Sequence, residues 1–152
     1  MRKVTMRSST TVSIAAVALI ATVVIWAGPT RVRASSVTGP CYITARAGET
    51  VKHRMKRIIR CAVDRWSVPG GSTKAICVAN RESHLNPHAS SATGKYLGLF
   101  QHAATAWPGR YAKWTRPEWQ LRRSALNGRT NAIVTIRMVH SDGWGPWKGA
   151  GC

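Results

Sequence analysis

Acidic residues are scarce in this sequence. Only five of the 152 residues are Asp or Glu, against 23 Lys and Arg, which gives a formal net charge of +18 at pH 7. Five of the basic residues precede Ser35, so the rest of the chain still carries a net charge of +13. Such a surface attracts anionic partners.

Other absences narrow the class of protein. No internal repeat is visible, which argues against a repeat architecture. No Cys-x-x-Cys pair occurs and the histidines do not fall at ligand spacing, so we expect neither a metal nor a cofactor. No recognition-helix signature or aromatic strand pair accompanies the charge, so we expect no nucleic-acid partner.

Residues 1–34 have the pattern of an export segment. Basic residues precede a nearly apolar run over residues 11–28, and Val32-Arg33-Ala34 is a suitable cleavage site. Arg31 and Arg33 oppose translocation, and the run is close to the ~18 residues that can span a bilayer, so an uncleaved membrane anchor is the alternative. In both cases the rest of the chain is secreted or extracytoplasmic, and it touches a membrane only through this segment.

The remainder divides into an arm and one small, mainly α-helical domain. Residues 35–49 are rich in Ser, Thr and Gly, and they form a linker unless Cys41 is tied down. Residues 50–152 suit a single domain, which we expect to be monomeric.

Hydrophobic periodicity predicts the helices of this domain. An amphipathic helix with a basic outer side covers residues 51–66, and Ser72 is the expected N-cap of the next helix. A short helix is expected over residues 102–107, broken by Pro108-Gly109, and the last helix over residues 130–140. Residues 144–147 are too rich in Gly and Pro to continue that helix, so they should fold over the core as an irregular strap.

All four cysteines follow the apolar segment, and their even number in an exported chain predicts two disulfides. Three pairings are possible. The helices before and after the Pro-Gly-Gly turn should run antiparallel, with Cys61 and Cys77 about equally far from it. This favours Cys61–Cys77, which leaves Cys41 to pair with Cys152.

Glu82 lies at the end of an apolar helical stripe. Ala75, Val78 and Ala79 precede it by seven, four and three residues, so they share its helix face. A partly buried carboxylate near a helix C-terminus resists ionisation, and its pKa rises. The alternative is a surface ion pair of Glu82 with Arg81 or Lys74.

The surrounding motifs resemble those of the lysozyme-like lytic transglycosylases. They are, in chain order, Glu82-Ser83, Asn86-Pro87, Tyr96 with Gly98-Leu99-Phe100-Gln101, and Asn131-Ala132 leading to Gly143-Trp144-Gly145-Pro146-Trp147. The resemblance covers roughly residues 50–152. It implies a lysozyme-like domain with a short β or irregular segment beside a cleft that binds peptidoglycan glycan strands.

The resemblance also implies a mechanism with one acid. Glu82 would protonate the leaving oxygen of the β-1,4 bond between MurNAc and GlcNAc, and its carboxylate would then deprotonate the muramic 6-hydroxyl. Gln101 would position the substrate, Ser83 would orient Glu82, and Asn131 would bind sugar. The family's later Ala-Tyr-Asn motif has no clear match, which leaves Tyr96 and Tyr111 as substitutes for its tyrosine.

The tryptophans divide into two expected groups. Trp66, Trp107, Trp144 and Trp147 are assigned mainly to the core, since large rings bury most of their area in small domains. Trp114 and Trp119 lie in a basic, aperiodic stretch and are the candidates for stacking on sugar.

Two other functions remain open. A hydrolase of the same bond normally needs a second carboxylate, and none lies between residues 83 and 117. A non-catalytic, cationic wall-binding or antimicrobial module would need no acid, and its charge would suit the anionic cell wall.

Overall fold

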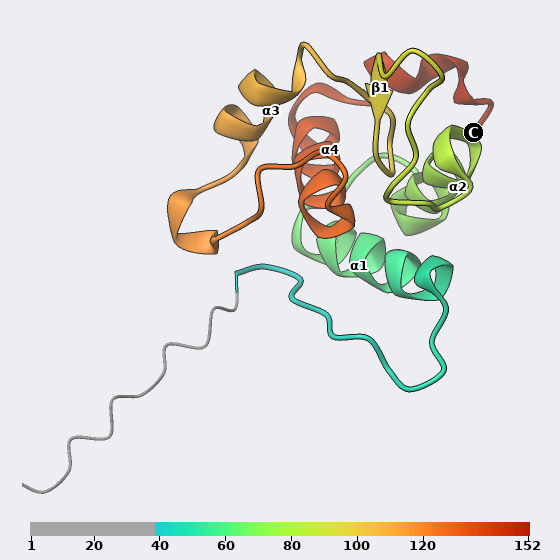
Figure 1. Cartoon of the computed structure of the whole chain (residues 1–152), viewed down its shortest axis with the longest axis vertical. Helices are drawn as coiled ribbons and strands as arrows, with labels where there is room; N and C mark the ends of the chain where they lie inside the picture. The colour runs from blue at the N-terminus through green and yellow to red at the C-terminus, as the bar shows by residue number, and fades with distance from the viewer. Residues whose placement is uncertain (1–38) are drawn as a thin grey trace, which may run out of the picture. The chain divides into compact units, whose positions relative to one another are not determined.

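The computed structural model describes residues 39–152. These residues form a mainly helical body in which α4 (Gly128–Asp142) takes the centre and packs against α1 (Val51–Arg65) and α3 (Trp107–Trp114) (Figure 1). The second helix, α2 (Gly71–Ser83), packs against α1 and against the 3-10 helix η2 (Gly145–Ala150). A short 3-10 helix, η1 (Pro117–Trp119), follows α3.

The expected export segment, residues 1–34 with the apolar run 11–28, lies outside the described residues. Within the described part of the chain, no helix is long and apolar enough to cross a membrane.

Three helices follow from the periodicity of the sequence. In α1 the buried positions are Met55, Ile58, Ile59, Ala62 and Val63, which form one face. The helix that ends at Glu82-Ser83 and the helix over residues 130–140 are also present, as α2 and α4. Ten of the 15 residues of α4 are buried, including its polar residues Thr130, Asn131 and Thr135, because this helix is surrounded by the others.

Two local predictions were wrong. The N-cap of α2 is Gly70, which adopts the left-handed conformation at φ 79°, so that Ser72 lies inside the helix. Residues 102–106 are not helical, and Pro108 does not break a helix. Pro108 stands in the first turn of α3, where its missing N–H costs nothing.

Residues 96–103 form a β-hairpin instead. Strand β1 (Tyr96–Leu97) pairs antiparallel with β2 (His102–Ala103), in the register Tyr96 with Ala103 and Leu97 with His102. The four residues Gly98-Leu99-Phe100-Gln101 are its turn, and Gln101 N–H donates to the carbonyl of Gly98 at 3.1 Å. Leu99 and Phe100 are fully buried, so this turn penetrates the core.

Both expected disulfides are present, but the predicted pairing was wrong. The bonds join Cys41 to Cys61 and Cys77 to Cys152. On α2, Cys77 is two residues from both Ala75 and Ala79, which are buried, and residues two apart on a helix point to opposite sides. Cys61 has the same relation to Ile59 and Val63 on α1. The two cysteine side chains therefore point away from the buried faces by which α1 and α2 contact each other.

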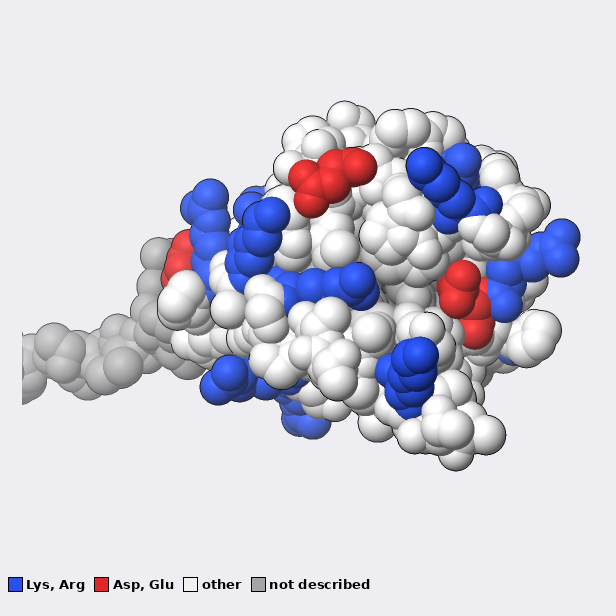
Figure 2. Space-filling model, turned by 90° about the horizontal axis from the view of Figure 1, so that it is seen from above, with Lys and Arg blue, Asp and Glu red and all other residues white. Residues whose placement is uncertain are grey.

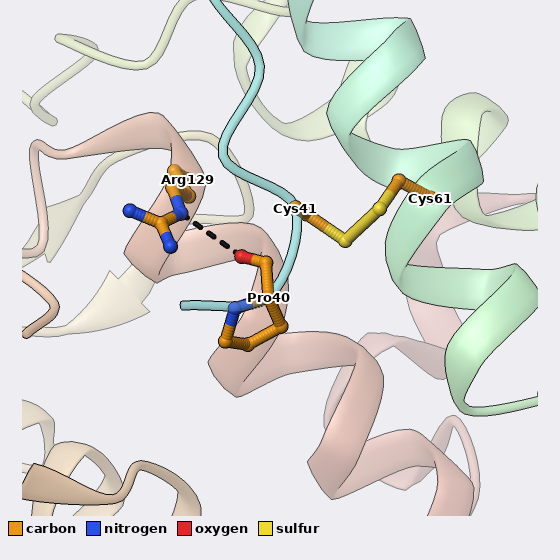
Figure 3. Close-up of a disulfide and its surroundings, with 4 residues drawn as sticks. All are labelled: Pro40, Cys41, Cys61 and Arg129. Atoms are coloured by element: carbon orange, nitrogen blue, oxygen red, sulfur yellow. Dashed lines mark hydrogen bonds between the residues drawn. A yellow bond between two sulfur atoms is a disulfide. The ribbon is translucent and has the colours of Figure 1, made fainter. Parts of the chain in front are cut away.

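The first disulfide fastens the arm to the domain (Figure 3). Next to it, Arg129 of α4 donates from Nε to the carbonyl of Pro40 at 3.0 Å. The second disulfide attaches the C-terminus to α2. Two disulfides are typical of proteins in an extracellular or otherwise oxidising environment.

The C-terminal strap closes over the core through its tryptophans. Trp144 donates from Nε1 to the carbonyl of Pro69 at 2.7 Å, and Trp147 donates to the carbonyl of Phe100 at 2.9 Å. Both rings are buried, as is Trp107, whereas Trp66 is half-buried against the core. The assignment to the core is therefore confirmed for Trp107, Trp144 and Trp147 and in part for Trp66. The strap contains 3-10 turns that are kinked at Trp147.

His102 lies completely buried under this strap. Arg110 donates to its Nδ1 at 2.8 Å, and because an arginine cannot accept, the ring carries its proton on Nε2 and donates to Thr135 Oγ1 at 2.7 Å. Burial and the nearby Arg110 charge lower the pKa of His102 to about 3. The ring is therefore neutral in the folded protein at ordinary pH.

This neutral ring should make folding sensitive to acid. In the unfolded chain His102 takes up a proton near pH 6.5, whereas the folded protein resists it down to about pH 3. The free energy of unfolding should thus fall, as the pH falls through that window, by up to about 1.4 kcal/mol per pH unit from this residue. Urea denaturation of wild type and His102→Gln measures it. When the free energy of unfolding is plotted against pH, the slope for the variant should be shallower by the uptake of about one proton. An unchanged slope would contradict the assignment.

Candidate active site

Glu82 lies in the last turn of α2, in a surface cleft. The cleft has a volume of about 340 Å³ and is lined by Arg81, Glu82, Tyr96, Gln101, Pro146 and Trp147. Three parts of the chain therefore meet there: the end of α2, the hairpin and the η2 strap. Pockets for small ligands commonly begin at about this size.

The environment of Glu82 disfavours its charged form. The side chain is partly exposed, and Ala75, Val78 and Ala79 on the same helix face are buried. Burial raises the pKa of Glu82 above its ordinary value. Among residues 39–152 it forms no ion pair, so neither Arg81 nor Lys74 neutralises it. A carboxyl group held in this way can remain protonated and donate its proton.

Glu82 is also the sole carboxylate in the lining of the cleft. Glu49 pairs with Arg57 at 2.9 Å, and Glu118 lies 3.9 Å from Arg116. Asp64 and Asp142 are exposed on α1 and α4. Since these four are all the other acids of the chain, no second carboxylate shares the cleft with Glu82.

Tyr96 and Gln101 lie where the sequence motifs indicate, beside Glu82. Tyr96 is 41 % exposed, so its ring is accessible to a ligand. The Gln101 amide nitrogen donates to the carbonyls of Gly98 at 2.8 Å and Ala89 at 3.3 Å. These bonds orient the side chain and leave its carbonyl oxygen as an acceptor for a substrate.

Ser83 and Asn131 do not lie on the surface of the cleft. The Ser83 hydroxyl is within 2.8 Å of the Leu99 carbonyl and 3.0 Å of the Ala79 carbonyl, so it joins α2 to the hairpin turn rather than contacting Glu82 or substrate. Asn131 is fully buried. Both residues belong to the framework beneath the site, which corrects their assignment to substrate binding.

Asn131 is the central support of the hairpin turn. Its side-chain oxygen accepts from the N–H of Phe100 at 3.0 Å, and its nitrogen donates to the carbonyls of Ala125 at 2.8 Å and Leu97 at 3.4 Å. Gly98, at φ 80°, makes room for it, because a Cβ there would overlap both the Asn131 amide and the Ala125 carbonyl. Both N–H groups of the amide are therefore engaged, and burial keeps its oxygen out of reach of a sugar.

Trp114 and Trp119 are not in the cleft either. Their rings and that of Trp66 surround the guanidinium of Arg137, at 5.8, 5.0 and 5.6 Å from its central carbon. Arg137 also donates to the carbonyl of Trp114 at 2.6 Å. This is a cation–π cluster that attaches α3 and η1 to α4. These two tryptophans therefore do not line the cleft of Glu82, and their contact with sugar stays a prediction.

The sequence reasoning missed two walls of the cleft. Pro146 and Trp147 belong to the motif Gly143 to Trp147, but Trp147 was assigned mainly to the core, whereas it is buried and also lines the cleft. Arg81 was considered only as a partner of Glu82. Arg81 lines the cleft and adds a positive charge to it, and Glu82 is the one carboxylate in the same lining.

Comparisons with known proteins find no matching family model, no similar curated protein and no similar solved structure.

Proposed function

We propose that this protein cleaves the β-1,4 bond between MurNAc and GlcNAc in peptidoglycan, with Glu82 as its single catalytic residue. The observation that carries the proposal is an unpaired, partly buried glutamate with a raised pKa, in a cleft that holds no other carboxylate. The resemblance of residues 50–152 to the lysozyme-like lytic transglycosylases supplies the substrate class. The basic surface, visible in Figure 2 with acidic groups in only a few places, suits an anionic cell wall.

The absence of a second carboxylate favours lytic transglycosylation over hydrolysis. Protonated Glu82 gives its proton to the glycosidic oxygen as the bond from that oxygen to the muramic C1 breaks. The resulting carboxylate then takes the proton of the muramic 6-hydroxyl, whose oxygen bonds to C1 and closes a 1,6-anhydro ring. Glu82 ends in its initial state and no water is consumed, so no second acid is required.

The other cleft residues have matching roles in this proposal. The free carbonyl oxygen of Gln101 accepts a hydrogen bond from an N-acetyl N–H or a hydroxyl group. The rings of Tyr96 and Trp147 offer apolar walls for the sugar. Arg81 can pair with a carboxylate of the peptide that substitutes the muramic residue.

The products of digestion in heavy-oxygen water test this proposal. We expect mass spectrometry of digested peptidoglycan to find unlabelled 1,6-anhydro ends, because no solvent oxygen enters them. Labelled reducing ends would instead show a lysozyme-type hydrolase, in which a water attacks C1. Wall binding with neither product would show the non-catalytic, cationic module.

A further inference from the structure

A second cavity, which shares no lining residue with the Glu82 cleft, contains three arginines. It has a volume of about 340 Å³ and lies where α1 meets the beginning of α4. Arg54, Arg122 and Arg129 line it together with apolar side chains, among them Met55, Ile58 and Leu121. Near apolar groups the interaction of a guanidinium with an anion is stronger than in open water.

The chain supplies no acid to balance these arginines. All five of its carboxylates belong to the described residues, and none of them lines this cavity. Glu49 and Glu118 are engaged with Arg57 and Arg116, respectively. Three arginines thus line one cavity without a counter-charge from residues 39–152.

Arg129 is fixed in the wall of the cavity by contacts with the arm. Its Nε donates to the carbonyl of Pro40 (Figure 3). Its guanidinium lies 5.3 Å from the centre of the Tyr42 ring. Its Nη2 is buried, and among residues 39–152 it has no hydrogen-bond partner. Leaving a buried donor unpaired is costly, more so when the donor is charged. Arg129 is held in place by its neighbours with part of its donor capacity unused.

The N-terminus of α4 adds to the positive potential of the cavity. Asn127 caps the helix by accepting from the N–H of Thr130 at 3.0 Å, which leaves the N–H groups of Gly128 and Arg129 without an intrahelical acceptor. The helix dipole is also positive at this end. A glycine is needed at 128, because a Cβ there would overlap the sulfur of Met55 and the ring of Pro87.

From these observations we infer that the cavity binds an oxyanion, namely a phosphate or carboxylate group of a small ligand. Guanidinium groups pair with both through parallel N–H to oxygen bonds, and the free N–H groups at the α4 N-terminus supply further contacts. This site is separate from the cleft of Glu82, so the inference does not depend on the proposed role of Glu82.

Isothermal titration of the full chain with inorganic phosphate and with acetate, at an ionic strength kept constant with sodium chloride, tests the inference. We expect saturable binding of one equivalent. Arg54→Gln and Arg122→Gln should weaken it about tenfold each, because each removes one charge-assisted contact. Arg60→Gln is the matched control: it removes the same charge from an exposed position on α1, outside the cavity, and should leave the affinity unchanged.

The pattern among the variants decides the outcome. Saturation by phosphate alone identifies a phosphate site, and saturation by acetate, alone or as well, identifies a site that also accepts carboxylates. Equal weakening by Arg54→Gln and Arg60→Gln would reduce the effect to the general charge of the protein and overturn the inference, as would the absence of saturable binding. Glu82→Gln should bind phosphate with unchanged affinity.

Discussion

Glu82→Gln should lower the rate of glycan cleavage by about 10²- to 10⁴-fold, the usual contribution of a general acid and base. The amide has nearly the same shape as the carboxyl group but has neither a proton to donate to the glycosidic oxygen nor a basic oxygen to accept one from the 6-hydroxyl. Because Glu82 makes no ion pair among the described residues, the substitution should leave the fold intact. Loss of turbidity of purified cell wall measures the rate.

Glu118→Gln is the matched control for this variant. It makes the same chemical change at an exposed glutamate of η1 whose carboxylate lies 3.9 Å from Arg116, outside the cleft. It should retain full activity and binding to the wall. Circular dichroism and a wall sedimentation assay verify that both variants fold and bind. Residual activity above about a tenth in a folded Glu82→Gln protein would remove Glu82 from the catalytic role.

The helices α1, α2 and α4 were predictable because their signals are local. The buried residues of α1 recur with the helical period within that one helix. In α2, Ala75, Val78 and Ala79 lie on the same face as Glu82 and within two turns of it. The same local pattern indicated the perturbed carboxyl group, and burial does raise its pKa. The candidate acid could thus be found from one short stretch of sequence.

The partners that join distant parts of the chain were not predictable in this way. The pairing of Cys77 with Cys152 spans 75 residues, and it depends on where the strap after α4 ends. The hairpin at residues 96–103 has strands of only two residues each, too short to show an alternating pattern. Trp114 and Trp119 became candidates for stacking on sugar because their stretch lacks periodicity, and nothing in the sequence indicated that Arg137, from another helix, contacts both rings.

Asn131 illustrates how a polar residue in a motif can be a support for the site rather than part of it. Its position on a helix with the pattern of a buried element was consistent with a contact to sugar or with a contact to backbone. The structure shows the second: its amide joins α4 to the turn that ends in Gln101, and Ser83 joins the same turn to α2. The cleft residue Gln101 therefore depends on two buried hydrogen-bonding side chains from two helices.

Asn131→Ala should consequently lower the free energy of unfolding by about 2–6 kcal/mol, because it leaves the N–H of Phe100 and the carbonyl of Ala125 buried without their partner, at about 1–3 kcal/mol for each such group. Asn80→Ala is the matched control, since Asn80 is exposed on α2 and alanine favours a helix; its stability should be unchanged or slightly higher. Urea denaturation measures both variants. A change below about 0.5 kcal/mol for Asn131→Ala would contradict its role as the support of the turn. Asn131 would then again be a candidate for contact with substrate.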